Sequence, residues 1–382
     1  MAEAGLVLDP AERASRRAAV PPLRAVRAEV VPIGEADALT GEWDRLSSYA
    51  MDDNPLFASP FVRAAAQRFG SGVAVATVRE AGGRLIGLAP VTWTRLGRVA
   101  PALRIWSHDY GPLGVPLLAS ADAAGGLIEA ARRAALVVPD LALDGAAAKA
   151  LLAAAEASGR AVTLVGVHRR AVFRTGLDPR EALSAKRRKE YGRQLRRLAE
   201  EGAVARETVT EAGAVTAAFE EFLALEGRGW KGERGTAMAV QADKVVFARE
   251  AVAGLAARGQ VLISTLRLEG RMIAGLVSLI SGDAAVTWKI AYDEGYARFS
   301  PGAQVMLDAP VALAARGVRH VDSLATPGHP LVDHIWKDRG TIGTLIIAPA
   351  GGWVRHRLGL ALLSAEMRAR GAAKRLRDRL RG

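Results

Sequence analysis

The residues with the clearest chemical potential lie where a strand pattern gives way to a helix start. Residues 286–292 alternate like a β-strand, and Ser300-Pro301 then has the composition of a helix N-terminus, with Ser300 as the expected N-cap. The first N–H groups of a helix have no intrahelical partner, so such a turn binds anions. The segment contains no nucleophile. It therefore predicts a binding site for a phosphorylated donor, formed by Arg298, Ser300, Pro301, Gly302, Ala303 and Gln304.

Three further residues could handle protons or charge close to that helix. Asp322 follows a predicted strand and could act as a base, or it could be a structural carboxylate at a turn with Ser323. Tyr292 ends the strand before the helix start and could protonate a leaving group, or it could be an ordinary edge aromatic residue. Lys337 could neutralise an anionic acceptor, or be a solvated charge on a short helix. Asp322, Tyr292 and Lys337 are the candidate catalytic residues.

A second group of residues is expected to contact the acceptor. Lys289 is a cation within a buried strand pattern, which is unusual unless a site uses it. Trp230 lies in a glycine-rich loop, where core packing explains a large ring poorly, so it suggests a substrate lid. Basic residues also occur early in a predicted helix, although a solvated basic face is the competing interpretation. The candidate acceptor-binding residues are Lys186, Arg187, Arg188, Trp230, Lys231, Lys289 and Trp336.

The sequence offers no recognisable metal site. His329, Asp333 and His334 are close together, but their spacing matches no common ligand pattern, and Pro330 interrupts it. The chain has no cysteine, which excludes disulfides, thiolate zinc and a cysteine nucleophile. It also lacks a Gly-x-Ser-x-Gly elbow and a Walker loop. We therefore expect no bound metal.

The elements that must position these residues occur twice along the chain. One hairpin pattern spans residues 75–91 and a second spans residues 262–278. Each has an arginine directly after its glycine-containing turn, Arg84 in the first and Arg271 in the second, about half the chain apart. Hairpins resemble one another in general. The helical pattern before each, and the strand and helix after each, nevertheless favour a duplicated α/β domain.

The duplication sets the predicted domain organisation. Residues 1–26 form an arm rich in alanine, arginine and proline, which is expected to be disordered. The first domain covers residues 27–167 and the second covers residues 168–350. Within the second domain, Asp178-Pro179 is expected to open a helix as N-cap and first helical residue. Residues 351–382 form a basic C-terminal helix.

The composition favours a protein that meets anions. The 52 basic residues exceed the 40 acidic ones, which gives a net charge of +12. Residues 353–382 hold nine of the basic residues against two acidic ones. That helix could lie on an anionic membrane surface, or it could be docked with a solvated end. Because we find neither a secretory signal nor an apolar run long enough to span a bilayer, we expect a cytoplasmic protein.

The order of elements in the second domain resembles a GNAT acyltransferase, and the duplication resembles the tandem layout of FemAB-like enzymes. Several phrases are also similar to a bacterial GNAT family linked to cellulose biosynthesis: Trp43 with Pro55-Leu56-Phe57-Ala58-Ser59-Pro60, Ser184-Ala185-Lys186-Arg187-Arg188, Trp230-Lys231-Gly232, Ala291-Tyr292-Asp293, Ser300-Pro301-Gly302, Asp322 and Trp336-Lys337. The resemblance covers about residues 30–350. It departs at the pyrophosphate loop, where Pro301 replaces the first glycine and offers one fewer N–H.

The resemblance implies an α/β fold of two tandem GNAT-like domains, each a mixed, mostly antiparallel sheet flanked by helices. It implies an acyltransferase of the N-acetyltransferase type. The donor would be acetyl-CoA or another acyl-CoA, and the acceptor an amine or hydroxyl of a small molecule, sugar or envelope polysaccharide precursor. Two alternatives stay open. One is FemAB-like aminoacyl transfer from charged tRNA, the case in which nucleic acid is a partner. The other is polyanion binding on a GNAT scaffold without catalysis.

Overall fold

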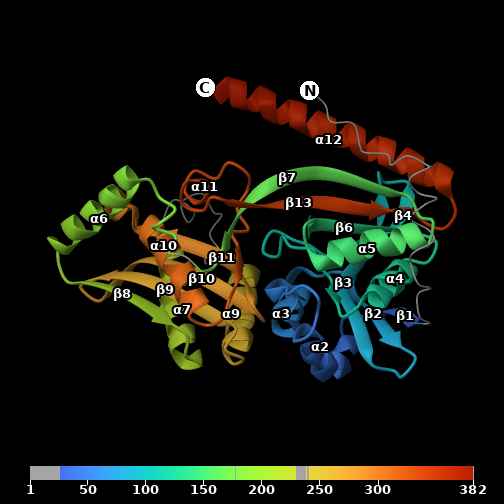
Figure 1. Cartoon of the computed structure of the whole chain (residues 1–382), viewed down its shortest axis with the longest axis horizontal. Coiled ribbons are helices and arrows are strands. Elements are labelled where there is room, and N and C mark those ends of the chain that lie inside the picture. The colour runs from blue at the N-terminus through green and yellow to red at the C-terminus, as the bar shows by residue number, and fades with distance from the viewer. Residues whose placement is uncertain (1–25, 177, 229–237, 239–240, 382) are drawn as a thin grey trace.

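Both predicted hairpins form within one mixed sheet that runs through the molecule (Figure 1). The computed structural model describes residues 26–176, 178–228, 238 and 241–381. Within these residues the strand order is β1-β2-β3-β4-β6-β13-β7-β12-β11-β10-β9-β8, with β5 pairing at the side of β3. The strands of the first half of the chain are β1 (Val26–Pro32), β2 (Val73–Glu80), β3 (Leu85–Leu96), β4 (Ala100–Ile105), β5 (Leu117–Leu118), β6 (Ala135–Ala142) and β7 (Val162–Arg174). Those of the second half are β8 (Val204–Val209), β9 (Val261–Leu268), β10 (Arg271–Ser281), β11 (Ala284–Tyr292), β12 (His320–Asp322) and β13 (Asp338–Ile347).

Helices fill the connections at matching places in the two halves. The first half contains the short helix η2 (Glu35–Leu39), α2 (Thr40–Ser47), η3 (Pro55–Phe57), α3 (Ser59–Phe69), α4 (Ala121–Ala130) and α5 (Ala146–Ala157). The second half contains α6 (Ala185–Ala199), α7 (Ala212–Arg228), α9 (Ala242–Ala256), η5 (Glu294–Phe299), α10 (Pro301–Ala314), α11 (Val332–Ile335) and α12 (Trp353–Arg381). This order, duplicated around one mixed sheet, is the predicted α/β fold.

The two halves exchange their last strands. In each half four strands pair antiparallel, β1 to β4 in the first and β8 to β11 in the second. The fourth of them then pairs in parallel with one more strand, β4 with β6 and β11 with β12. The next strand along the chain then crosses over: β7 pairs with β12, whereas β13 pairs with β6. β7 and β13 also pair with each other, as Figure 1 shows between the two halves. The predicted boundary between residues 167 and 168 therefore falls inside β7, and the sheet is continuous across it.

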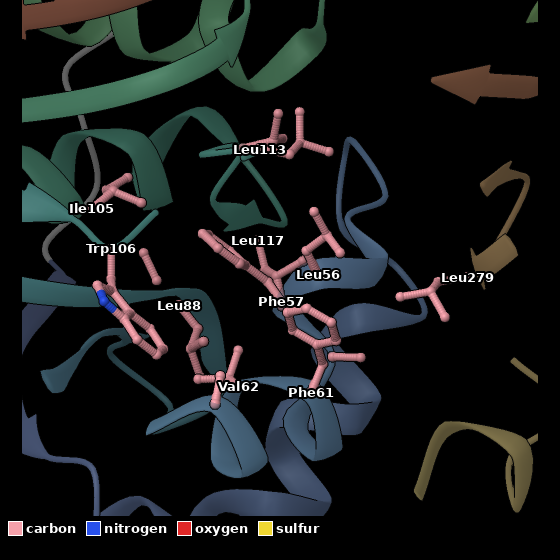
Figure 2. Packing of buried hydrophobic residues seen from close by; sticks show 14 of the residues in the cluster. Leu56, Phe57, Phe61, Val62, Leu88, Ile105, Trp106, Leu113, Leu117 and Leu279 are labelled. Atoms are coloured by element: carbon pink, nitrogen blue, oxygen red, sulfur yellow. The ribbon is translucent and has the colours of Figure 1, made fainter. Parts of the chain in front are cut away.

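The two halves also share a core through equivalent helices. α3 and α9 each precede a hairpin, and they pack closely, since a Cβ at Gly254 would lie 2.7 Å from the Cβ of Pro60. Phe61 and Phe247 meet edge to face between them, with ring centroids 5.4 Å apart. Figure 2 shows part of this cluster, in which Leu279 of β10 accompanies residues of the first half. The halves are thus joined by both the sheet and the core.

His108 lies within this aromatic cluster and should make the fold sensitive to acid. Its ring is 4.9 Å from that of Phe69 and 4.6 Å from that of Trp106. Burial lowers the pKa of His108 to about 4. The unfolded chain binds a proton near pH 6.5 and the folded protein does not, so stability falls as the pH drops from 6.5 to 4, by about 3 kcal/mol in total.

A His108→Phe variant should lose this part of the pH dependence. The test is the free energy of unfolding in urea at pH 7 and pH 4.5, with His334→Phe, at an exposed position, as the control. The loss of the hydrogen bond from the Tyr110 N–H to His108 Nδ1 (3.3 Å) lowers stability equally at both pH values. Identical pH dependence in wild type and His108→Phe would contradict the prediction.

One predicted helix start is wrong. Residues 178–180 form a turn, in which the Asp178 carboxylate accepts a hydrogen bond from the Arg180 N–H (2.8 Å). Helix α6 begins at Ala185, and its N-cap is Ser184, whose Oγ accepts from the Arg187 N–H at 3.4 Å. An aspartate before a proline satisfies a turn as readily as a helix cap, so the local pattern did not decide between them.

Candidate functional site

The parallel strands β11 and β12 separate part way along their length. They pair from Ala284 opposite His320 to Val286 opposite Asp322. The Thr287 hydroxyl then donates to the Ser323 carbonyl (3.1 Å), and the chain turns away at Leu324, whose φ of 51° is left-handed. No described strand pairs with the remainder of β11 on that side. Among the described residues, this part of β11 therefore borders an opening in the sheet and not a neighbouring strand.

A cavity of about 410 Å³ lies at this separation. Its size is that of a typical small-molecule site. β11 and the N-terminus of α10 form two of its walls, and the end of α7 forms another. The residues around it are Leu225, Glu226, Ile290, Ala291, Tyr292, Glu294, Ala297, Ser300, Pro301, Gly302, Ala303, His329, Pro330 and Leu331.

Four of the six predicted donor-binding residues, Ser300 to Ala303, line this cavity. Their local geometry differs from the expectation in one respect. Ser300 is left-handed (φ 51°, ψ 49°) and its side chain does not cap the helix. A Cβ at Gly302 would lie 3.3 Å from Cδ1 of Tyr292, so glycine lets the helix N-terminus approach the strand closely.

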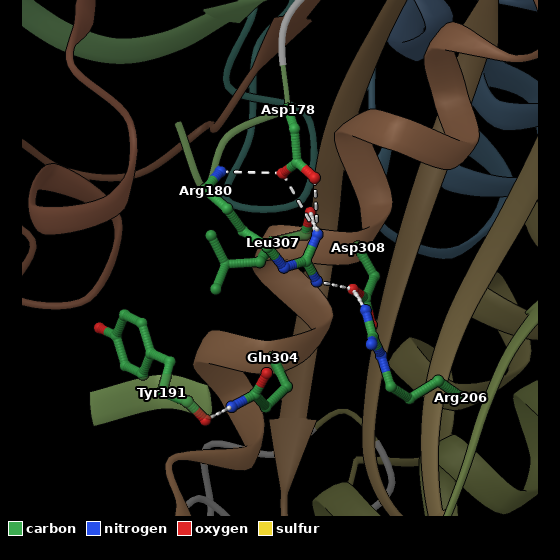
Figure 3. A network of polar contacts seen from close by, with 7 residues as sticks. All are labelled: Asp178, Arg180, Tyr191, Arg206, Gln304, Leu307 and Asp308. Carbon is green, nitrogen blue, oxygen red and sulfur yellow. Dashed lines mark hydrogen bonds and ion pairs between the residues drawn. The ribbon is translucent and has the colours of Figure 1, made fainter. Parts of the chain in front are cut away.

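The other two predicted donor-binding residues point elsewhere. The Arg298 guanidinium forms an ion pair with Glu201 (2.5 Å) and lies 4.6 Å from the ring centre of Phe299. The Gln304 side chain is buried and donates to the Tyr191 carbonyl at 3.1 Å (Figure 3). Neither lines the cavity. These placements argue against a direct contact of Arg298 or Gln304 with a ligand there.

Ion pairs fix the position of α10. The Asp308 carboxylate binds both Arg180 and Arg206, and Arg206 Nε lies 2.8 Å from Asp308 Oδ2 (Figure 3). Arg180 belongs to the turn before α6, and Arg206 belongs to β8. Since these contacts hold the middle of the helix, its N-terminus is oriented toward the cavity before any ligand binds.

Asp322 does not line the cavity. Its Oδ2 forms an ion pair with Arg170 (2.6 Å), and the two side chains are 8% and 4% exposed. Its Oδ1 accepts a hydrogen bond from the Leu324 N–H at 2.8 Å. Arg170 also donates to the Pro112 carbonyl of the first half. The structural alternative that we considered for Asp322 therefore fits its contacts, and they leave it poorly placed to act as a base.

Of the two remaining candidates for catalysis, one lies inside the cavity and one outside it. Tyr292 lines it. Trp336, expected to bind the acceptor, is fully buried and packs on Phe173 with ring centroids 5.8 Å apart. Its neighbour Lys337 is exposed and does not line the cavity. The reason is that β13 begins at Asp338, so residues 336 and 337 lead into a strand that belongs to the core.

None of the predicted acceptor-binding cations among the described residues lines the cavity. Lys289 reaches the junction of the halves, where its Nζ is 4.4 Å from the ring centre of Tyr110. The Nζ of Lys244 lies 5.4 Å from the same ring. Lys186 and Arg188 are exposed near the start of α6, and Arg187 donates to the His334 carbonyl at 3.1 Å. Trp230 and Lys231 lie outside the described residues.

Sequence reasoning missed Glu226, the acidic side chain with the strongest claim to the site. It lines the cavity, is 3% exposed and accepts a hydrogen bond from the Met238 N–H at 2.9 Å. A signal existed: with Phe219, Phe222 and Leu223 it occupies the i, i+3, i+4, i+7 positions of the apolar face of α7. A carboxylate at a core position calls for an explanation.

No metal centre is evident in the described part of the chain. No group of three or more histidine, aspartate or glutamate side chains there is placed to hold an ion. His329 lines the cavity, and its Nδ1 faces the Leu331 N–H at 3.3 Å.

Comparison with known proteins agrees with this geometry. A family model described as an acetyltransferase (GNAT) domain matches residues 185–330. FemX aligns with a TM-score of 0.53 and 11% identity over 80% of this chain and 95% of its own. The C-terminal DUF2156 domain of a proposed lysylphosphatidylglycerol synthetase from Agrobacterium fabrum aligns with a TM-score of 0.50 and 13% identity, over 86% of this chain and 96% of its own. A conserved protein of unknown function from Bacteroides thetaiotaomicron aligns with a TM-score of 0.51 and 11% identity, over 81% of this chain and 97% of its own.

Comparison with curated proteins finds no match in sequence. The structural likenesses, all below 25% identity, establish the shared fold. The family match, over residues 185–330, is to a GNAT acetyltransferase domain, and the structural likenesses agree with that fold.

Proposed function

We propose that the protein transfers an acyl group from acyl-CoA, acetyl-CoA in the simplest case, to an amine or hydroxyl of an acceptor. The observation that carries this proposal is the cavity at the separation of β11 and β12, bounded by the N-terminus of α10. The helix N-terminus offers N–H groups and a positive dipole end to the phosphates of the donor. We assign the stabilisation of the oxyanion, which forms when the thioester is attacked, to the backbone of β11 where that strand lines the cavity.

The acyl transfer needs a group that takes the acceptor proton and one that returns a proton to the leaving thiolate. Glu226 and Tyr292 are the two ionisable side chains that we assign to these tasks, because both line the cavity. Glu226 takes the proton from the acceptor, and Tyr292 at the end of β11 protonates the thiolate. Lys289, at the junction of the halves, is placed to attract an anionic group of the acceptor.

The lining of the cavity does not by itself narrow the acceptor to one class of amine or hydroxyl compound. The phrases shared with the cellulose-biosynthesis type of GNAT protein favour a sugar or an envelope polysaccharide precursor. Kinetic screening of amino sugars, sugars and simple amines, by release of free CoA, is the direct way to find it.

A Gly302→Val variant should bind the donor about 10- to 100-fold more weakly. The new side chain would enter the space between α10 and Tyr292, since even a Cβ would approach within 3.3 Å of that ring. The expected loss corresponds to about one charge-assisted hydrogen bond at the helix N-terminus. Calorimetry with acetyl-CoA measures it. Gly351→Val is the control, because a Cβ there meets no atom within 4 Å. An unchanged dissociation constant for Gly302→Val would place the donor elsewhere.

One observation favours the second candidate function, aminoacyl transfer from charged tRNA. Helix α6 packs beside η5, which borders the cavity, and it exposes Lys186, Arg188 and Lys189. Such a basic helix beside the donor site suits a polyanionic donor. Titration with bulk tRNA at two salt concentrations decides between the two: tight, salt-dependent tRNA binding without acetyl-CoA binding would move the assignment to tRNA. Binding of polyanions without turnover of any donor would leave the non-catalytic alternative.

A further inference from the structure

Helix α12 packs on the sheet through only one of its faces. Leu360 and Leu363 contact a buried cluster on β3, β4, β6 and β13 that includes Leu96 and Ile346. The helix approaches the β3–β4 turn closely, because a Cβ at Gly97 would lie 2.3 Å from the Gly359 carbonyl oxygen. Figure 1 shows α12 running along one side of the molecule, above β7 in this view. The helix is therefore firmly docked, and its opposite face is free to meet something else.

That opposite face is apolar. Trp353, Val354, Leu358 and Leu362 are 65%, 61%, 51% and 41% exposed. Val354, Leu358 and Leu362 are spaced four residues apart and so form one stripe, opposite the side that carries buried His356 and Gly359 and partly buried Leu363. Exposed Ala361 and Ala365 continue the same stripe. We call these five residues, Val354, Leu358, Ala361, Leu362 and Ala365, the outer stripe.

Cations surround the outer stripe. Arg355, Arg357 and Arg368 are exposed on the same helix. Below the helix, a cavity of about 230 Å³ between α12 and the sheet is lined by Arg95, Arg98 and Arg104, with Glu366 as its acidic member. Within the described residues, the side chains of these three arginines make no hydrogen bond and no ion pair, although Asp140 acts on Arg104 from a distance. Arg95 and Arg98 are exposed and Arg104 is half-buried, so this side of the molecule presents positive charge beside the helix, as an anionic surface would favour.

We propose that this side of the molecule docks on the surface of a lipid bilayer that contains anionic phospholipids. The outer stripe enters the boundary between headgroups and acyl chains, and the arginines of α12 and of the cavity bind lipid phosphates. The proposal is independent of the acyl-transfer chemistry. Among the described residues no helix, α12 included, is long and apolar enough to cross a bilayer, so docking here means contact with the surface.

A second copy of the chain is the competing occupant, and charge argues against it. An isologous contact would bring the same arginines of both copies together. Residues 353–382 carry nine basic and two acidic residues, so two such helices repel each other. An anionic surface, in contrast, complements both the charge and the apolar stripe.

The test is flotation of the full-length protein with vesicles. We expect binding to vesicles of phosphatidylglycerol and phosphatidylcholine, weaker binding as salt rises, and little binding to phosphatidylcholine alone. A Leu358→Asp, Leu362→Asp double variant should bind vesicles at least about tenfold more weakly, because it removes apolar side chains from the outer stripe. An Arg95→Gln, Arg98→Gln double variant should also bind at least about tenfold more weakly, since each cation near the surface contributes about fivefold. Val311→Asp is the matched control, because Val311 is 45% exposed on α10.

The urea midpoint of each variant is measured as well, because Leu362 lies beside Gly97 of the β3–β4 turn; a midpoint equal to that of the wild type shows that lost binding is not unfolding. Equal binding of the wild type to both kinds of vesicle, or equal binding of wild type and both double variants, would overturn the proposal. So would a wild-type dimer in analytical ultracentrifugation that the Leu358→Asp, Leu362→Asp double variant abolishes, because the stripe would then belong to a second copy.

Discussion

An Asp322→Ala variant is expected to lose about 3–5 kcal/mol of unfolding free energy, because it leaves a buried guanidinium without its counter-ion. The Arg170 side chain is 4% exposed, and its Nη2 lies 2.6 Å from Asp322 Oδ2. Its Nη1 donates to the Pro112 carbonyl, and its Nε has no hydrogen-bond partner among the described residues. Once Asp322 is removed, Arg170 keeps one weak contact and most of its desolvation cost.

Urea unfolding at pH 7 measures this loss. Glu190→Ala is the control, since Glu190 pairs with Arg193 at the surface, where the two side chains are 42% and 57% exposed and such pairs contribute about 1 kcal/mol or less. An Asp322→Ala, Arg170→Met double variant should recover part of the loss, because it removes both buried charges together. A single-variant loss below about 1 kcal/mol would show that the pair is solvated, contrary to its burial.

The same carboxylate shapes the site from a distance. Asp322 Oδ1 accepts a hydrogen bond from the Leu324 N–H at 2.8 Å in the turn that follows β12, where the chain turns away from β11. The left-handed conformation of Leu324 is unfavourable for a residue with a Cβ and persists where the surroundings hold it. Asp322 thus fixes the point at which β11 and β12 separate. Loss of activity in an Asp322 variant should therefore accompany loss of stability, which a purely catalytic base would not show.

Much of the fold follows from local patterns in the sequence. Both hairpins form where alternation and glycine-containing turns predicted them, with left-handed Gly83 and Gly270 in the turns. The helix start at Pro301 was found because proline, small residues and an apolar run coincide there. These signals are readable because each depends on residues that are neighbours in the chain.

The exchange of the last strands was not predicted. Pairing of β13 with β6 joins residues about 200 positions apart, and no local pattern encodes such a partner. Two long strands, β7 and β13, are also hard to recognise from local alternation. The pairing register shifts between Ile342 and Thr344, and Gly166 has a positive φ in the middle of β7, so the alternation is interrupted where each strand continues.

The candidate site was predicted where it depends on the backbone and missed where it depends on side-chain partners. Ser300 to Ala303 line the cavity because a helix N-terminus has a fixed place after its strand. Arg298 and Asp322 were chosen by position in the sequence, but each has a counter-charge, Glu201 for the first and Arg170 for the second. These partners come from other elements, so only the folded chain reveals them.

A Glu226→Gln variant should lose about 10²- to 10⁴-fold in kcat if Glu226 takes the acceptor proton, which is the usual contribution of a general base. Glutamine keeps the shape of the side chain, and its Oε1 can still accept the Met238 hydrogen bond that Glu226 makes at 2.9 Å. What it loses is the ability to accept a proton from the acceptor. Donor binding should therefore change little, since the N-terminus of α10 and the edge of β11 remain intact.

The decisive comparison is CoA release with the first acceptor that turns over, alongside calorimetry with acetyl-CoA. Glu220→Gln on the same helix is the control, because Glu220 is 46% exposed and pairs with Arg249 at the surface. Wild-type kcat in Glu226→Gln would exclude the carboxylate as the base. A loss of donor affinity equal to the loss of kcat/KM would instead show that Glu226 holds the donor. A fall in kcat with unchanged donor affinity and an unchanged unfolding midpoint is the result that proton transfer predicts, because glutamine can keep the hydrogen bond from the Met238 N–H.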